Sequence, residues 1–349
     1  MSRKVSHSIV NGRVVVGTGG QGLKIDWFST NLGNLHWLDV DESTLEAFYM
    51  LGGTNYGYCA GGYAAADTDA IDKWSLSSDA NATDVGNLTR IAGASQVAGC
   101  SSSTHGYASG GLRAGVQWYD IIEKWTFASD ANATDVEDLT AGRNGMAGIS
   151  SEDYGFVAAG KETGDTRVNK IEKFTFASDA ASTNVGDVTV TRETPAGCSS
   201  ATHGYAAGGY NGGESEVIDK FSTVSDANAT DVGNLAFNVA NAAGSSSTDN
   251  GYTSGGNDVD DGYIDYIQKF SFSSDGNASD IGNLSRGKAT PTGGASSTTN
   301  GYQAGGKIHS GGGVVSVLDI DKYAFASDGN ATDIGDLNEI RTNSAGAQY

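Results

Sequence analysis

The chain has 349 residues, with 51 Gly but only 2 Pro, and 42 Asp and Glu against 21 Lys and Arg. The glycine excess has no Gly-x-y period, which excludes collagen, and 38% hydrophobic residues exclude a wholly disordered chain. The net charge of −21 argues against binding nucleic acid or an anionic lipid surface, because both need clustered basic residues.

We expect neither a membrane span nor a disulfide framework. No stretch approaches the roughly 20 apolar residues that cross a bilayer, and the first residues lack the apolar segment of a secretory signal. Three cysteines are an odd number, so the chain folds without disulfide cross-links in this interpretation.

A six-residue pattern, Gly-[Tyr/Phe]-x-[Ala/Ser]-[Ala/Gly]-Gly, recurs along the chain and indicates a tandem repeat. A weaker copy comes first, and its last glycine is Gly20. The last glycines of the copies are 42, 49, 49, 49, 47 and 50 residues apart, so the sequence predicts seven units with a short first one. The six clear copies end at Gly62, Gly111, Gly160, Gly209, Gly256 and Gly306.

Within each unit the sequence predicts four strands, which we label a to d. Strand a is rich in small residues, strand b ends in the glycine pair, strand c is aromatic (residues 71–76), and strand d reads Asp-Val-Gly-Asn-Leu (84–88). The c strands alternate as half-buried strands do, with Glu172 and Phe174 on one face and Lys173 on the other. The Asn-Gly pair of residues 250–251 predicts an a–b hairpin turn, because both residues tolerate positive φ.

Four short antiparallel strands at this period predict an all-β fold, a seven-bladed β-propeller of four-stranded blades. Small a strands suit the crowded axis, and aromatic c strands suit the wider space between blades. Residues 341–349 form an a strand with no b strand after it, and we expect it to complete the first blade and close the ring. Residues 1–349 would be one domain, with an irregular first blade at 8–51, six regular repeats at 52–340 and the closing strand at 341–349.

The glycine pair, the aromatic c strand and an Arg soon after strand d resemble the Kelch repeat of galactose-oxidase-like propellers, over residues 14–349. Val or Ile, as at Val85, stands where the Kelch repeat has a Trp in strand d. The tandem motifs Ser-Asp-x-Asn-Ala-Thr-Asp and His-Gly-Tyr-x-[Ala/Ser]-Gly-Gly are similar to repeats in virion proteins of marine tailed bacteriophages. That resemblance implies a tail or host-attachment appendage.

The c–d turns carry oxygen ligands at alternate positions, as in Asp79, Asn81 and Thr83, which is the spacing of calcium loops. The twelfth position holds Arg90 instead of the bidentate Glu of such loops, and Asp and Asn also suit tight turns. We therefore interpret these residues as structural turns, with calcium as the alternative, and we expect no other metal and no cofactor.

Arginines recur after the turn aspartate at the entrance of strand a. Ring symmetry would place them around the axis, where they would either brace neighbouring blades or attract an acidic sugar or carboxylate. We keep both interpretations for Arg90, Arg143, Arg192 and Arg286.

The b–c loops differ in length and content, whereas the a–b and c–d turns are nearly identical between units. In a four-stranded meander, the b–c and d–a connections share one end of the sheets, which we call the loop face; the opposite end is the turn face. Individual loops on a rigid scaffold are typical of recognition sites, and their aromatic residues would contact sugars or proteins or fold back over the blades. The candidates are Tyr63, Trp118, Tyr119, Tyr210, Tyr263 and Tyr266.

These patterns predict a non-enzymatic bacteriophage virion protein that binds another virion protein or a host-surface glycan through the loop face. Trp27, Trp37 and Phe48, in the irregular first unit, are candidates for docking onto the rest of an assembly. The alternatives are an extracellular or cell-surface bacterial lectin or scaffold and, third, a carbohydrate-active enzyme, although no catalytic constellation is visible.

Overall fold

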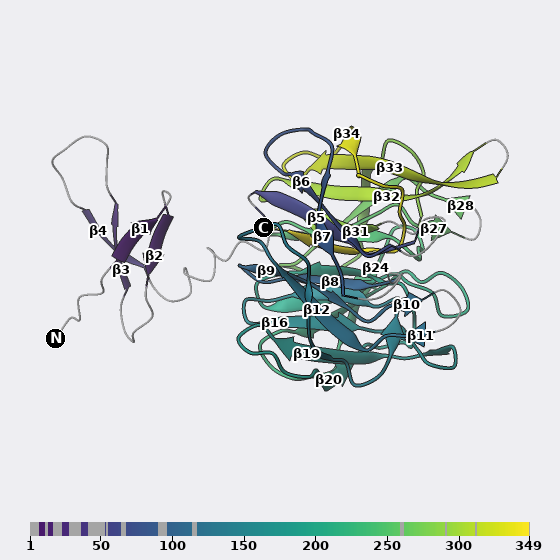
Figure 1. The fold of residues 1–349 in the computed structure, drawn as a ribbon, viewed down its shortest axis with the longest axis horizontal. Helices are drawn as coiled ribbons and strands as arrows, with labels where there is room; N and C mark the ends of the chain where they lie inside the picture. The colour runs from purple at the N-terminus through teal and green to yellow at the C-terminus, as the bar shows by residue number, and fades with distance from the viewer. Residues whose placement is uncertain are drawn as a thin grey trace. The chain divides into compact units, whose positions relative to one another are not determined.

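A computed structural model places the chain in two compact units, Met1–Met50 and Leu51–Tyr349 (Figure 1). It describes the strands at 7–10, 13–16, 23–27 and 36–40, and residues 53, 55–63, 68–89, 96–113, 117–258, 262–289, 292–310 and 313–348. All regular structure in these residues is β-strand, which confirms the all-β class. Among them, no helix is long and apolar enough to cross a membrane.

The first unit contains two antiparallel strand pairs. Strand β1 (His7–Val10) pairs with β2 (Arg13–Val16), and β3 (Leu23–Trp27) pairs with β4 (His36–Val40). Both sheets are two-stranded, so the described strands of this unit do not form the four-stranded first blade expected at residues 8–51. The division into two units also differs from the expected single domain.

The described residues of the second unit form six four-stranded antiparallel sheets, each in the order a-b-c-d. Sheet 1 is β35 (Ala345–Gln348), β5 (Tyr56–Ala60), β6 (Ala70–Ser75) and β7 (Thr83–Asn87); sheet 2 is β8 (Ala98–Ser101), β9 (His105–Ser109), β12 (Ile121–Thr126) and β13 (Thr134–Asp138); sheet 3 is β15 (Ala147–Ser150), β16 (Tyr154–Ala158), β19 (Lys170–Thr175) and β20 (Thr183–Asp187). Sheet 4 is β21 (Ala196–Ser199), β22 (His203–Ala207), β23 (Val217–Ser222) and β24 (Thr230–Asn234); sheet 5 is β25 (Ala243–Ser246), β26 (Asn250–Ser254), β29 (Tyr266–Ser271) and β30 (Ser279–Asn283); sheet 6 is β31 (Thr292–Ser296), β32 (Asn300–Ser310), β33 (Gly313–Ala324) and β34 (Thr332–Asp336).

The C-terminal strand pairs with a different unit from the one expected. β35 lies antiparallel to β5, with Ala345 opposite Ala60 and Gln348 opposite Gly57. Figure 1 shows the C-terminus beside sheet 1. The expectation that residues 341–349 complete the irregular first unit is therefore wrong: they complete the first regular repeat. The four-stranded sheets of the described residues number six, and the predicted seven-bladed ring is not confirmed.

The a strands of the six sheets contact one another in a closed cycle. β35 contacts β8, and contacts continue through β15, β21, β25 and β31, which contacts β35 again. A glycine at the centre of each a strand allows this approach: a Cβ on Gly197 would lie closer than 3 Å to the carbonyl oxygen of Gly148. The same crowding recurs at Gly99, Gly148, Gly244, Gly294 and Gly346.

The glycines of the repeated b-strand pattern have two different roles. The first, such as Gly155, lies under the ring of the c-strand aromatic Phe174 in the same sheet, where a Cβ would collide with it. His-Gly and Asn-Gly pairs therefore belong to the b strands rather than to turns, so the turn interpretation of residues 250–251 is wrong. The closing pair, as at Gly208 and Gly209, has φ values of 68° and 100°, a left-handed conformation that favours glycine.

Aromatic side chains fill the space between neighbouring sheets, as expected. A b-strand ring packs on c-strand rings of the next sheet: Tyr205 of sheet 4 stacks on Phe272 of sheet 5 with ring centroids 4.8 Å apart. Equivalent stacked pairs are Tyr58 with Phe127, Tyr107 with Phe176, and Tyr252 with Phe325. Burial of these rings contributes about 1.5–3 kcal/mol each and holds neighbouring sheets together.

Additional short strands extend the sheets on the loop face. β10 (Leu112–Arg113) pairs with β11 (Gln117–Trp118), and β27 (Asn257–Asp258) pairs with β28 (Gly262–Tyr263). β17 (Lys161–Glu162) pairs with both β14 (Arg143–Asn144) and β18 (Thr166–Arg167). The β32–β33 hairpin of sheet 6 runs past the end of β34 and projects from the sheet (Figure 1).

The close contact of a strands makes a direct prediction. Gly197→Ala would force β21 away from β15, and we expect it to lower the free energy of unfolding by about 3 kcal/mol, as overpacking of a core does. Gly276→Ala is the matched control, because a Cβ there meets nothing within 4 Å. Urea unfolding of the two variants measures the difference, and equal stabilities would contradict the packing of the a strands.

Candidate functional site

Two of the recurring arginines, Arg143 and Arg192, are buried inside the sheets. Both are fully buried and are ion-paired with the c-strand carboxylates of Glu172 and Asp219. Nη2 of Arg192 lies 2.6 Å from Oδ2 of Asp219 and donates to the carbonyl of Ala206 at 2.9 Å. The terminal nitrogens of both guanidinium groups therefore pair with protein acceptors, while their Nε atoms make no hydrogen bond with the described residues. This pairing favours the bracing interpretation for these two residues.

Each buried carboxylate also holds the end of the preceding sheet. Thr189, just after β20 of sheet 3, donates its amide at 3.1 Å and its hydroxyl at 2.7 Å to Asp219 of sheet 4. Burial alone would raise the pKa of Glu172, but the Arg143 guanidinium and hydrogen bonds from Ser182 and Thr140 hold it below its ordinary value. The Arg143–Glu172 pair thus connects neighbouring sheets with its carboxylate favoured in the charged form.

The other sheets vary this arrangement. In sheet 1, Arg341 pairs with Asp72 at 3.0 Å. In sheet 6, Lys288 pairs with Asp319 at 2.6 Å and Asp321 at 2.8 Å. Arg286 has a 46% exposed side chain 3.4 Å from Asp319, so it does not occupy the buried position, and Arg90 lies outside the described residues.

Sheet 5 replaces both charged partners at once. Val239 stands at the arginine position, five residues before the a-strand glycine, and Gln268 stands at the carboxylate position. Oε1 of Gln268 accepts the amide of Phe237 at 2.9 Å, as the carboxylates accept threonine amides elsewhere. Both partners of the ion pair are thus replaced together, so no buried charge is left without its counter-charge, as a packing role requires.

The polar c–d turns join neighbouring sheets at their outer edge. The carboxylate of Asp79 pairs with Lys322, the carboxamide oxygen of Asn81 accepts the amide of Asp336 at 3.1 Å, and the Thr83 hydroxyl donates to the carbonyl of Lys73 at 3.5 Å. Within the described residues, no group of three or more His, Cys, Asp or Glu could hold a metal ion. These contacts favour the structural interpretation of the turn over the calcium alternative. The Lys–Asp pairs form a cycle through all six sheets: Lys73–Asp130, Lys124–Asp179, Lys173–Asp226, Lys220–Asp275, Lys269–Asp328 and Lys322–Asp79.

The loop-face aromatics are less exposed than expected. Tyr119 is only 5% exposed and packs in a core cluster, so it is not a surface contact residue. The other five are half-buried. Tyr263 stacks on His309 with ring centroids 4.3 Å apart, and Tyr266 stacks on Phe237 at the same distance.

Tyr63 and Tyr210 hold equivalent places in sheets 1 and 4. In each case the residue after the closing glycine pair forms a β-bridge with the residue that precedes the entrance to strand a: Tyr63 with Thr342, and Tyr210 with Glu193. The guanidinium of Arg167 lies 4.7 Å over the ring of Tyr210. Each bridge therefore holds the start of a b–c loop against the d–a connection of the same sheet.

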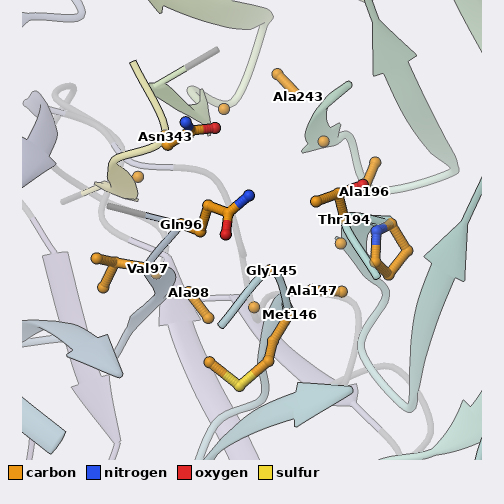
Figure 2. Close-up of a pocket in the computed structure, with 18 of the residues that line it drawn as sticks. Gln96, Val97, Ala98, Gly145, Met146, Ala147, Thr194, Ala196, Ala243 and Asn343 are labelled. Atoms are coloured by element: carbon orange, nitrogen blue, oxygen red, sulfur yellow. The ribbon is translucent and has the colours of Figure 1, made fainter. Parts of the chain in front are cut away.

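A cavity of about 130 Å³ opens where the d–a connections converge (Figure 2). Four of its polar side chains come from a position three residues before the a-strand glycine: Gln96, Thr194, Asn241 and Asn343. Gly145 holds the same place in sheet 3, and Ser344 also lines the cavity. The sequence interpretation missed these residues, although their constant spacing from the axial glycine is visible once that glycine is recognised.

The first-unit candidates are placed only in part. Trp27 ends β3 opposite His36, and Trp37 in β4 is opposite Asp26. Phe48 lies outside the described residues. Their proposed docking role remains a prediction.

No protein-family model and no curated protein matches the chain. The Kelch and bacteriophage resemblances therefore depend on the repeat motifs themselves.

Sheet 5 has a neutral pair where sheet 4 has an ion pair, and this difference predicts what happens when the neutral pair is introduced into sheet 4. Arg192→Val alone would leave Asp219 buried without its counter-charge, and we expect a loss of about 3–5 kcal/mol in urea unfolding. Adding Asp219→Gln, which copies Val239 and Gln268, should restore most of that loss. Equal instability of the single and double variants would contradict the bracing role.

Proposed function

We propose that the second unit is a six-bladed β-propeller closed by β35, and that the chain is a non-enzymatic binding protein of a bacteriophage particle. The closed cycle of a-strand contacts and the cycle of Lys–Asp pairs support the propeller. The loop face would bind another virion protein or a host-surface glycan.

One observation carries the binding role: the turns at one end of the sheets are alike from sheet to sheet, whereas the loops at the other end differ. On the turn face the same hydrogen bond closes successive a–b turns, from the amide of Ser102 to the carbonyl of His105 at 2.9 Å and from Ser200 to His203 at 2.8 Å. On the loop face the described extensions differ from sheet to sheet: sheets 2, 3 and 5 carry β10–β11, β14–β17–β18 and β27–β28, and sheet 6 has the long β32–β33 hairpin. Uniform turns are explained by folding, whereas individual loops on a rigid scaffold are typical of recognition.

The projecting β32–β33 hairpin is the most exposed apolar element of this face. Val314 and Val315, near its tip, are 49% and 45% exposed, and the ladder around them pairs His309 with Val314 and Ile308 with Val315. An uncharged strand tip of this kind is costly to leave in water and suits a partner surface. Trp118 on β11 and Tyr210 supply half-buried aromatic surface on the same face.

The use of charged groups supports a role without catalysis. Arg143, Arg192 and Arg341 are fully buried and paired within the sheets, so they do not converge on a substrate carboxylate as the arginines of a sialidase would. The repeat resemblance to virion proteins of marine phages supports the particle as the location.

A matched pair of substitutions tests the proposal. Val315→Lys puts a charge on the loop face, and Val224→Lys puts one on the turn face, where Val224 is 77% exposed. We expect virions of the phage that encodes the chain to contain it by mass spectrometry. We also expect the labelled protein to bind host cells or virions lacking it, with binding lost in Val315→Lys and kept in Val224→Lys.

Absence of the chain from purified virions would contradict the proposed location. Loss of binding in Val224→Lys but not in Val315→Lys would contradict the proposed face. Circular dichroism melting of both variants should match the parent chain, because neither valine is buried.

A further inference from the structure

The axial cavity is built from equivalent positions in different sheets. Gln96 precedes sheet 2, Thr194 precedes sheet 4 and Asn343 precedes β35 of sheet 1, so their side chains reach the axis from different directions. Figure 2 shows the carboxamide of Gln96 extending toward the middle of the lining residues, with the carboxamide of Asn343 at their edge. Because these residues begin the a strands, the cavity opens on the loop face.

The backbone holds these side chains in place. The amide of Gln96 donates to the carbonyl of Asn343 at 2.7 Å, the amide of Gly145 to Gln96 at 3.0 Å, and the amide of Thr194 to Gly145 at 2.6 Å. Gln96, Thr194 and Asn343 have φ values of 59°, 56° and 60°. A β-branched residue rarely adopts this conformation, and such strain is typical of positions held for function.

The cavity has hydrogen-bonding capacity that the chain does not use. The carboxamides of Gln96 and Asn343, which both line it, make no hydrogen bond with the described residues. Asn241 is already engaged, since its amide group donates to Asn257 at 2.7 Å. The free carboxamides can therefore both donate to and accept from a ligand.

The lining chemistry restricts the class of ligand. None of the described lining residues is charged, so an ionic ligand would lose its hydration without gaining a counter-charge. The net charge of −21 further disfavours sialylated, sulfated or nucleic-acid ligands. A purely apolar group would leave the carboxamides without hydrogen-bond partners, whereas the adjacent hydroxyls of a sugar both donate and accept.

We propose that the axial cavity binds the terminal sugar of a neutral glycan, with Gln96 and Asn343 as the principal contacts. A cavity of about 130 Å³ is below the range of roughly 300–1,000 Å³ typical of drug-sized ligands, so it can take up part of a single sugar and leaves the remaining chain outside. This inference rests on the proposed binding role of the loop face.

The test uses the full chain and small neutral probes. Methyl glycosides of glucose, galactose, mannose and N-acetylglucosamine, with N-acetylneuraminic acid as the charged counterpart, are titrated by saturation-transfer NMR. We expect at least one neutral glycoside to bind with millimolar affinity and the acidic sugar not to bind.

Glycine substitutions remove the contacts without disturbing the fold, because Gly145 already occupies the equivalent place in sheet 3 and glycine suits positive φ. Gln96→Gly and Asn343→Gly should each weaken glycoside binding at least tenfold while the melting temperature stays unchanged. Gln117→Ala, an exposed glutamine of β11, is the matched control and should leave binding unchanged.

Binding of no neutral glycoside, binding that persists in both glycine variants, or preference for N-acetylneuraminic acid would each overturn the inference. If no glycoside binds while the protein still attaches to virions or cells through the loop face, the partner is a protein, and the proposed function survives without this ligand. If glycosides bind but attachment does not depend on Val315, the cavity stands and the proposed face is wrong.

Discussion

Six strands approach one axis so closely that no side chain fits between their backbones, and the rest of the second unit depends on this contact. A Cβ on Gly148 or Gly244 would collide with a carbonyl oxygen of the preceding a strand. At the turn-face end of these strands, serine hydroxyls satisfy the neighbouring backbone: the amide of Ser101 donates to Oγ of Ser150 at 2.9 Å, and the amide of Ser199 donates to Oγ of Ser246 at 2.9 Å. Small residues at the axis are therefore required by space, and small polar ones by hydrogen bonding.

Farther from the axis, three kinds of contact keep neighbouring sheets together. Aromatic rings from b and c strands stack across each junction, buried carboxylates such as Asp219 connect a d strand to the next sheet, and Lys–Asp pairs join the outer turns. The exposed pairs contribute little singly, about 0–1 kcal/mol, so the rings and buried groups supply most of the cohesion. With the sheets fixed in this way, the loop face can vary without loss of the fold, which is the condition for placing a binding site there.

Much of the repeat could be predicted from the sequence, because each strand position has one dominant requirement. The alternation of Glu172 and Phe174 predicts the c strands, and the period predicts one sheet per repeat. The role of the first unit and the pairing of β35 could not be predicted, since the a strand at 341–349 fits any sheet that lacks its first strand. Burial of Tyr119 and of the arginines depends on contacts between distant residues, which local patterns do not reveal. The residues that line the axial cavity become visible only once the axial glycines are known.

The central claim is that β35 closes a ring of six sheets by pairing with β5. Hydrogen exchange of the C-terminal peptide, measured by mass spectrometry on the intact chain, tests it most directly. The account predicts that the amides of Ala345–Gln348 exchange as slowly as those of the equivalent strand Ala196–Ser199 in sheet 4. Rapid exchange of the C-terminal amides, with protection retained in sheet 4, would contradict it.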